Sequence, residues 1–323
     1  MIRYILKRLL ALLPMLFGVT LIAFIIMKAA PGDPVGMFMD PSVNLQDIQR
    51  IRSNLGFDKP ILVQYFIWLK NVLMGNFGYS LISGKPALQA ILERLPATLL
   101  LSISSLILIL LITFPLGILS GYKKDSAIDN GITVFSFLGL SMPSFWLGLM
   151  LILLFSFQLN LFPTSGFMNP LLYGEPFYRQ WGNIAYHMCL PLLTIMIGGV
   201  AGLTRYNRFG IIKILGQDYI TAARARGLSE SRILFKHAFK NILLPIITLL
   251  GLDLPGLISG SYIIEFIFSW PGMGQLAIQS VFQRDYPILM AAILLSSVLI
   301  IIGTLLSDIC YAYIDPRITK KGQ

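Results

Sequence analysis

Long apolar runs, separated by polar segments of unequal length, most restrict how this chain can fold. Six runs carry few charged residues: Leu9–Met27, Ala97–Leu119, Ile132–Phe157, Met188–Leu203, Ile242–Phe268 and Ile288–Tyr311. A helix of about 20 apolar residues crosses a bilayer, and a helix satisfies its own backbone hydrogen bonds there. We therefore predict an all-α polytopic membrane protein with six transmembrane helices.

Composition supports the same class of protein. Charged residues make up 12% of the 323 residues, about half the share in soluble domains. The net charge of +10 would suit a nucleic-acid-binding protein, but the basic residues gather at the ends of the apolar runs, as membrane topology requires. We therefore expect contact with the lipid bilayer and none with nucleic acid. Cys189 and Cys310 fall in different runs, which argues against a disulfide framework.

The basic residues also indicate which side of the membrane each segment occupies. Lys7 and Arg8 precede the first run, and Lys123 and Lys124 follow the second. The segment 205–240 holds eight more: Arg205, Arg208, Lys213, Arg224, Arg226, Arg232, Lys236 and Lys240. Because Lys and Arg are enriched in cytoplasmic loops, we predict that this loop and both termini are cytoplasmic.

This topology divides the chain into four parts. Residues 1–30 contain the cytoplasmic N-terminus and the first helix, and residues 31–96 form a small extracytoplasmic helical segment. Residues 97–313 form the main transmembrane domain with helices 2 to 6, and residues 314–323 are a cytoplasmic tail. Within the extracytoplasmic segment the pattern of apolar residues predicts short helices at Leu45–Leu55 and Ile61–Leu73.

A polar motif in the loop 205–240 has the composition of a docking helix. Asp218 is placed to cap a short helix and Gly227 to end it. Small residues and cations lie between them: Thr221, Ala222, Ala223, Arg224 and Arg226. Small side chains permit close approach to a partner, and arginines can pair with its acidic groups. A solvated basic loop is the alternative, which composition alone favours.

Several motifs resemble one family of membrane proteins. Thr221-Ala222-Ala223, Gly227 and Leu244-Pro245 resemble the coupling loop of the inner-membrane permeases of binding-protein-dependent ABC importers. Thr221 replaces an acidic residue of the general pattern, and Leu244-Pro245 lies five residues later than in it; both departures resemble the dipeptide/oligopeptide/nickel branch. The segment from Glu265 to Gly274 is similar to a second family motif. The resemblance covers nearly the whole chain.

The resemblance implies a type I ABC importer permease fold in a bacterial inner membrane. The implied partners are a homologous second permease subunit, two ATPase subunits and an extracytoplasmic substrate-binding protein. ATP and Mg would be bound by the ATPase subunits, and this chain would bind no cofactor. It would form half of the pore of an importer for dipeptides or oligopeptides. The loop residues implied to contact an ATPase subunit are Asp218, Thr221, Ala222, Ala223, Arg224, Arg226 and Gly227.

The sequence lacks the motifs of common catalytic sites. It contains no G-x-x-x-x-G-K-[ST] phosphate-binding loop and no H-E-x-x-H motif. Its two histidines, His187 and His237, fall in different predicted loops. We therefore expect no catalytic residue, no metal site and no ATP hydrolysis by this chain.

A few residues within the apolar runs are candidates for roles in the pore or its gate. Asp253 could line the pore or pair with a neighbouring helix, and Ser259 and Met142 are further pore-lining candidates. Pro143 is expected to kink its helix. Gly256 and Gly260, spaced four apart, could let another helix approach closely, and with Pro255 they could equally form a hinge. Glu265 is expected to be structural, accepting hydrogen bonds from backbone amides around Trp270, Pro271 and Gly272.

Other functions remain open at this stage. Within the same family, the chain could be a nickel or metallophore permease. In another class, it could be an ion-coupled secondary transporter, although such proteins usually carry inverted repeats and several intramembrane ionisable groups. A membrane scaffold without a transport role is a third possibility.

Overall fold

The computed structural model describes residues 2–30, 58–239, 241–243, 246, 249 and 261–314. Within these ranges the chain is helical or forms turns, and the only β-pairing is an isolated bridge between Tyr79 and Pro86. The predicted all-α class is therefore confirmed for this part of the chain. Several residues singled out from the sequence lie outside the described residues: Leu45–Leu55, Leu244-Pro245, Asp253, Pro255, Gly256, Ser259 and Gly260.

Among the described residues, three helices are long and apolar enough to cross a membrane. They are α4 (Ala87–Tyr122), α7 (Phe177–Leu215) and α13 (Tyr286–Ile314). A bent pair, formed by α5 (Ala127–Ser141) with α6 (Ser144–Leu151) and η1 (Ile152–Gln158), would make a fourth span. Six spans remain a prediction, because much of the expected fifth span lies outside the described residues.

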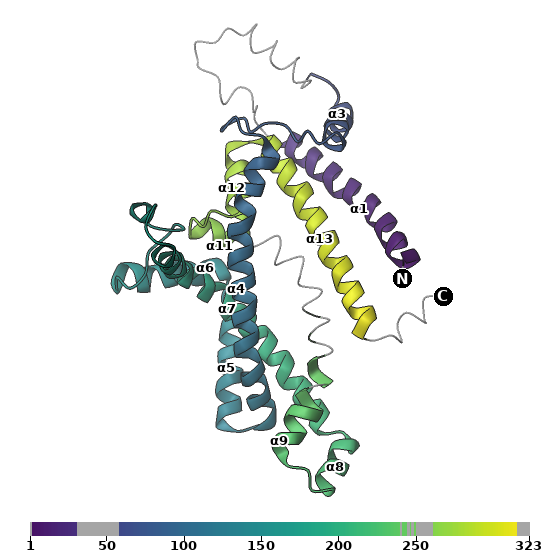
Figure 1. Ribbon diagram of the computed structural model, residues 1–323, viewed down its shortest axis with the longest axis vertical. Helices are drawn as coiled ribbons and strands as arrows, with labels where there is room; N and C mark the ends of the chain where they lie inside the picture. The colour runs from purple at the N-terminus through teal and green to yellow at the C-terminus, as the bar shows by residue number, and fades with distance from the viewer. Residues whose placement is uncertain are drawn as a thin grey trace.

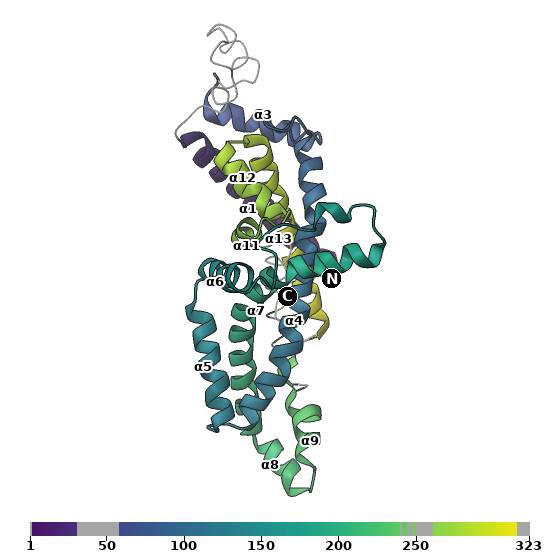
Figure 2. The same ribbon diagram turned by 90° about the vertical axis from the view of Figure 1, so that its left-hand side faces the viewer.

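The long helices form an elongated assembly, seen from two sides in Figures 1 and 2. Helices α4, α5 and α7 pack together, and α1 (Ile2–Ala29) packs against α13. The turn between α4 and α5 lies at the same end of the molecule as α8 (Asp218–Ala225) (Figure 1). The opposite end carries α3 (Ile61–Leu73) and α12 (Met273–Gln283).

Small residues bring α4, α5 and α7 into close contact. A Cβ atom added to Gly121 of α4 would lie 2.7 Å from the Ile211 side chain of α7, and one added to Gly139 of α5 would lie 3.0 Å from Ala201 Cβ. A methyl group at Gly121 would force the facing side chain to move, and one at Gly139 would make a very tight contact. The three helices form one tightly packed unit.

A second packed unit lies at the end that carries α3. The predicted helix Ile61–Leu73 is confirmed, with the expected bounds. Its Tyr65 side chain is fully buried, and Tyr65 Oη lies 3.0 Å from Thr20 Oγ1 of α1. Tyr65 also shares an apolar cluster with Phe24 of α1 and Met290 of α13. This packing fixes α3 across the ends of α1 and α13.

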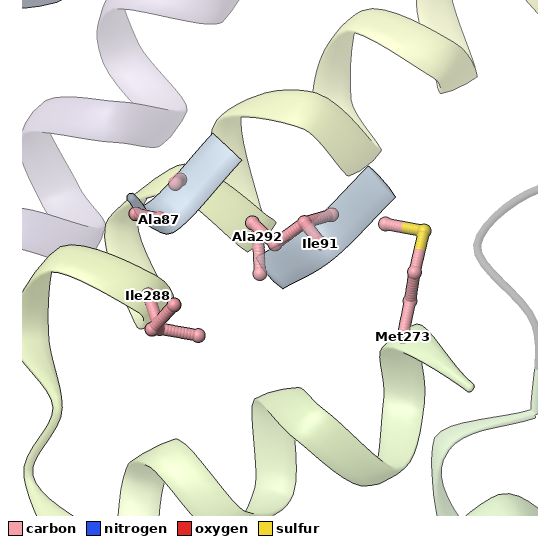
Figure 3. Packing of buried hydrophobic residues seen from close by; sticks show 6 residues of the cluster. Ala87, Ile91, Met273, Ile288 and Ala292 are labelled. Carbon is pink, nitrogen blue, oxygen red and sulfur yellow. The ribbon is translucent and has the colours of Figure 1, made fainter. Parts of the chain in front are cut away.

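The same end contains an apolar cluster that joins helices distant in the sequence. Figure 3 shows Ala87 and Ile91 of α4 beside Met273 of α12 and Ile288 and Ala292 of α13. All five are at most 3% exposed. The first turns of α4 are thereby attached to the C-terminal part of the chain.

Two helices are longer than the apolar spans predicted within them. The second was expected to begin at Ala97, but α4 begins at Ala87 and continues through Pro96. The fourth was expected at Met188–Leu203, but α7 covers Phe177–Leu215 and includes His187, which was expected in a loop. The prediction ended each helix where polar residues begin, whereas these helices continue past their apolar parts.

The third predicted span is broken rather than kinked. The axes of α5 and α6 differ in direction by 101°. Met142 caps the C-terminus of α5 in an extended conformation, and Pro143 stands at the N-cap of α6. Proline cannot donate a backbone hydrogen bond and disfavours a helical conformation in the residue before it. Pro143 interrupts the helix as predicted, but the change of direction is larger than the predicted kink.

Candidate functional site: the α8–α9 hairpin and two buried carboxylates

The polar motif of the loop folds as a helical hairpin at the end of α7. Helix α8 (Asp218–Ala225) is followed by α9 (Glu230–Arg232) and by the π-helical turn η3 (Ile233–Phe239). We call residues 218–239 the α8–α9 hairpin. Because α7 continues to Leu215, the first third of the predicted loop 205–240 is helical. Only two residues separate α7 from α8.

The sequence predicted the residue that ends α8 correctly, but not the residue that caps its N-terminus. Gln217 occupies the N-cap, so the expectation that Asp218 caps the helix is wrong by one position. Asp218 lies in the first turn, where a negative charge interacts favourably with the helix dipole. The prediction that Gly227 ends the helix is confirmed: its φ is +77°, a conformation that strongly favours glycine.

Backbone hydrogen bonds close the C-terminus of α8 around Gly227. The Gly227 N–H donates to Arg224 O at 2.9 Å, and the Leu228 N–H donates to Ala223 O at 3.3 Å. This pair of bonds is the Schellman motif, which satisfies carbonyl groups left free at a helix end. The motif turns the chain back so that η3 lies against α8.

A small apolar core holds the hairpin together. Ile220 and Ala223 of α8 are buried against Ile233, and the end of α7 contributes Ile214 and Leu215. Ala223 therefore faces its own chain, whereas Ala222 is exposed. Exposed residues of α8 and the residue that caps its C-terminus lie away from this core: Asp218, Tyr219, Thr221, Ala222 and Arg226.

One of the two arginines of the motif is engaged within the hairpin. Arg224 Nε donates to Glu230 Oε1 at 2.7 Å, and Arg224 Nη2 donates to Glu230 Oε2 at 3.2 Å. The guanidinium holds the pKa of the Glu230 carboxyl below its ordinary value, through this hydrogen bonding and its positive charge. Both side chains are exposed. Arg224 was expected to pair with a partner, but in this structure it pairs with Glu230.

The motif around Glu265 forms a compact corner between α11 (Tyr262–Ile267) and α12. Glu265 is 0% exposed, and its Oε2 accepts hydrogen bonds from the N–H groups of Gly274 and Gln275 at 2.7 and 3.2 Å. Thr98 Oγ1 donates to Glu265 Oε1 at 2.8 Å and accepts from the Met273 N–H at 2.8 Å. The first three amides of α12 are thereby satisfied by two side chains.

Neighbouring motif residues fit closely around this carboxylate. A side chain at Gly272 would collide with Glu265 and Thr98, so only glycine fits there. The buried Trp270 donates from Nε1 to Ala97 O of α4 at 2.8 Å. Across Pro271, the Gly272 N–H donates to Trp270 O at 2.7 Å. The expected hydrogen bonding of Glu265 to backbone amides is confirmed, although the amides belong to residues just after those named.

A second buried carboxylate was missed by the sequence reasoning. Asp129, in the first turn of α5, is 0% exposed. Arg208 of α7 donates to it from Nε and Nη2 at 2.6 and 2.7 Å. The Ser120 hydroxyl and the Asp125 N–H also donate to it. Asp129 lies just before the predicted third span, and its partner is 79 residues away, so no local motif marks it.

The predicted site residues thus fall into separate places. The α8–α9 hairpin and the Glu265 corner lie at different levels of the molecule (Figure 1). Met142 is half-buried and Pro143 is exposed, both at the α5–α6 break. Within the described residues no three His, Cys, Asp or Glu side chains are grouped as metal ligands.

Comparison with known protein families shows to which family the chain belongs. Residues 113–320 match the family described as the binding-protein-dependent transport system inner membrane component. Residues 1–102 match the N-terminal part described for the same transport systems. This chain belongs to that permease family. The α8–α9 hairpin, the Glu265 corner and the Asp129–Arg208 pair all lie in the region of the first match.

Curated relatives of this permease span almost its full length. It is 46% identical over 319 residues to the oligopeptide transport system permease protein AppB of Bacillus subtilis, covering 98% of this chain and 99% of the relative. It is 36% identical to a putative peptide permease protein of Brucella suis, with 98% and 99% covered. It is 35% identical to the glutathione transport system permease protein GsiC of Escherichia coli, with 99% and 100% covered. These relatives place the permease in the dipeptide/oligopeptide branch.

A solved structure supports the fold of the permease. A chain of the MetNI methionine ABC transporter, in an inward-facing conformation, superposes with a TM-score of 0.55. The superposition covers 71% of this chain and 98% of that chain, at 16% sequence identity. At this identity the likeness shows the fold alone, which is that of a type I ABC importer permease.

Proposed function

We propose that this permease forms half of the translocation pore of an ATP-driven importer for short peptides. The observation that carries the proposal is the near full-length similarity to oligopeptide, peptide and glutathione permeases. The complete importer would contain a homologous second permease, two ATPase subunits that bind ATP and Mg, and an extracytoplasmic substrate-binding protein. The substrate-binding protein would deliver the peptide, and the ATPase subunits would drive the change of conformation.

The α8–α9 hairpin is the proposed contact with an ATPase subunit. Its outward side combines the small residues Thr221 and Ala222 with the exposed cation Arg226. The apolar core and the Schellman motif give the hairpin a defined shape without help from a partner. A rigid element at the end of α7 is suited to carrying movement from the ATPase to the membrane.

The arrangement of the helices supports a cytoplasmic location for this end of the molecule. The N-terminal end of α1 and the C-terminal end of α13 point the same way as the α8–α9 hairpin (Figure 1). Lys123 and Lys124, in the α4–α5 turn, lie at that end too. Because basic residues favour the cytoplasmic side, we propose that both termini are cytoplasmic. The segment containing α3 would then be extracytoplasmic, where the substrate-binding protein docks.

The pore-lining residues remain proposals. Met142 stands at the α5–α6 break and is half-buried, a position from which it could face a pore shared with the second permease. Asp253, Ser259, Pro255 and Gly256 belong to the expected fifth span and keep their proposed roles as pore or hinge residues.

The function is tested by expressing the chain with its neighbouring genes and reconstituting the purified complex in proteoliposomes. We expect ATPase subunits to co-purify, and ATP-dependent uptake of a labelled peptide mixture to require the substrate-binding protein. A chain that purifies alone, and moves solute along an ion gradient without ATP, would instead establish a secondary transporter.

The docking surface is tested by substitutions at one exposed position. Ala222→Trp adds bulk outside the hairpin core, so we expect the chain to insert normally but to lose binding of the ATPase subunits and peptide uptake. Ala222→Ser is the matched control and should retain both. Ala223→Glu is a poorer probe, because Ala223 is buried in the hairpin core. Normal uptake by Ala222→Trp at equal expression would show that α8 docks through another surface.

A further inference from the structure

The Asp129 carboxylate sits in a site built from three helices. Arg208 of α7 makes two parallel hydrogen bonds to it, Ser120 of α4 donates its hydroxyl, and Asp125 donates its N–H from the α4–α5 turn. Ser126 also caps α5 by accepting from the Asp129 N–H. Both carboxylate oxygens are therefore satisfied, and the charge is matched by one guanidinium.

Such a pair is poor evidence for stability alone. Removing two charges from water costs several kcal/mol per ion, and a well-packed apolar pair is often equally stable. A bidentate arginine–carboxylate pair does, however, fix distance and orientation more strictly than apolar contacts can. The Arg208 side chain is 17% exposed, whereas that of Asp129 is 1% exposed. The carboxylate is therefore the part of the pair that is most shielded from solvent.

The position of the pair relates it to the α8–α9 hairpin. Arg208 lies on α7 two helical turns before Leu215, where α7 ends. Leu215 and Ile214 then pack on Ile220 of α8. A continuous set of contacts therefore runs from α5, through the ion pair and the end of α7, into the hairpin. Beside the pair, Gly121 of α4 packs directly on Ile211.

We propose that Asp129 and Arg208 are positioning residues that lock α4, α5, α7 and the α8–α9 hairpin into one lever. Movement of the hairpin is then delivered to the helices of the α4–α5–α7 unit together, instead of tilting α7 alone. The role in transport rests on the proposed function, whereas the mechanical lock does not.

The lock is measured first, without reference to transport. Spin labels are attached at Lys123→Cys in the α4–α5 turn and Ser229→Cys in the hairpin, with Cys189 and Cys310 replaced by serine. Both labelled positions are exposed. In the complete complex in nanodiscs, we expect one narrow distance distribution, which Asp129→Asn broadens and Arg208→Lys broadens less. Unchanged widths in both variants would overturn the lock.

The role in coupling is measured on the same complex in proteoliposomes. We expect Asp129→Asn to keep nucleotide binding and basal ATP hydrolysis while peptide uptake per ATP falls about tenfold, within the usual range of coupling between sites. Asp129→Asn combined with Arg208→Gln removes both charges and should restore folding stability but not coupling. A merely structural pair would instead show recovery of both.

The two measurements separate failure of the lock from failure of the proposed function. If the wild-type complex imports no peptide but the distance distribution still broadens in Asp129→Asn, the lock stands and the peptide-importer assignment falls. If peptide import is normal in the wild type and uptake per ATP is unchanged in Asp129→Asn, the importer assignment stands and the role of the pair in coupling is refuted.

Discussion

Two of the buried carboxylates of this permease, Glu265 and Asp129, are held in contrasting ways. Glu265 is surrounded by neutral donors, two backbone amides and the Thr98 hydroxyl. Asp129 is held by the guanidinium of Arg208 together with Ser120 and a backbone amide. The backbone donors to Glu265 lie nine and ten positions after it, and its hydroxyl donor, Thr98 of α4, lies 167 positions before it. The Asp129 site joins elements 79 residues apart.

The difference separates two uses of a buried acid. At Glu265 the carboxylate replaces missing backbone partners at the start of α12, so it shapes the chain locally. At Asp129 the carboxylate fixes one helix of a packed unit relative to another. The Glu265 corner has no space for an added atom, whereas the Asp129 site depends on the charge of its carboxylate. Substitutions at the two sites should therefore fail for different reasons.

The largest expected effect is from Gly272→Ala in the Glu265 corner. The added methyl group collides with the carboxylate and with Thr98, so overpacking is combined with broken buried hydrogen bonds. We expect a loss of about 4 kcal/mol in the free energy of unfolding, measured by denaturation of the permease complex in detergent. Gly198→Ala in α7, where a Cβ meets nothing within 4 Å, is the control and should be neutral or stabilising. Equal stability of the two variants would contradict this description of the corner.

Asp129→Ala should have the second-largest effect, because it leaves the charged Arg208 side chain without its partner. Breaking a buried pair by removing one partner costs about 3 to 5 kcal/mol. Because Arg208 is partly exposed, we expect a loss of about 3 kcal/mol in the free energy of unfolding. Adding Arg208→Met to this variant should recover a large part of the loss, as seen by the same denaturation. The comparison fails if the double variant is no more stable than the single one.

Trp270→Phe should have a smaller effect and affect only the corner. The ring remains large enough to pack against Phe167, 4.8 Å away between ring centroids, but the hydrogen bond to Ala97 O is lost. We expect a cost of about 1 kcal/mol. Hydrogen exchange should increase in α11 and α12 and stay unchanged in α5. Increased exchange in α5 would show that the two sites are coupled.

The smallest expected effect concerns the exposed Arg224–Glu230 pair, a surface counterpart of the Asp129–Arg208 pair. The folded-state pKa of Glu230 is lowered, so its stabilising contribution is present above the unfolded pKa and is lost as pH falls through the folded pKa. Because exposed ion pairs contribute little, acidification from pH 7 through the titration of Glu230 should slightly lower the hydrogen-exchange protection factors of the α8–α9 hairpin, which are calculated against the intrinsic exchange rate at each pH. Glu230→Gln should remove that pH dependence. A large change in the overall melting temperature in Glu230→Gln would contradict the assignment of a minor role.

The same contrast explains what could be predicted from the sequence. Glu265, Trp270 and Gly272 lie within one short motif, so their shared site was predictable from their spacing and from the family resemblance. Gly227 was predictable because a helix end favours glycine there. The pairing of Asp129 with Arg208 could not be predicted, because the residues around each of them do not indicate the other. The burial of Ala223 was also missed, since the composition of α8 does not show which side packs on η3.

Helix ends are hard to predict for a related physical reason. The apolar part of a helix shows only where lipid surrounds it, and the helix can extend beyond that part. Helix α7 continues to Leu215 with polar residues, because its backbone hydrogen bonds do not depend on lipid. The helix Ile61–Leu73 was correctly bounded because Pro60 precedes it and its apolar pattern ends at Met74-Gly75.

The break between α5 and α6 restricts where lipid can lie. Pro143 has no N–H to donate, so the carbonyl that it would pair with in a continuous helix needs another partner. Acyl chains cannot supply one, and irregular backbone is tolerated at membrane depth only against protein or water. If this bent pair spans the bilayer, the surface around Met142 and Pro143 is closed to acyl chains. Under that condition, the surface must face other protein or a hydrated passage.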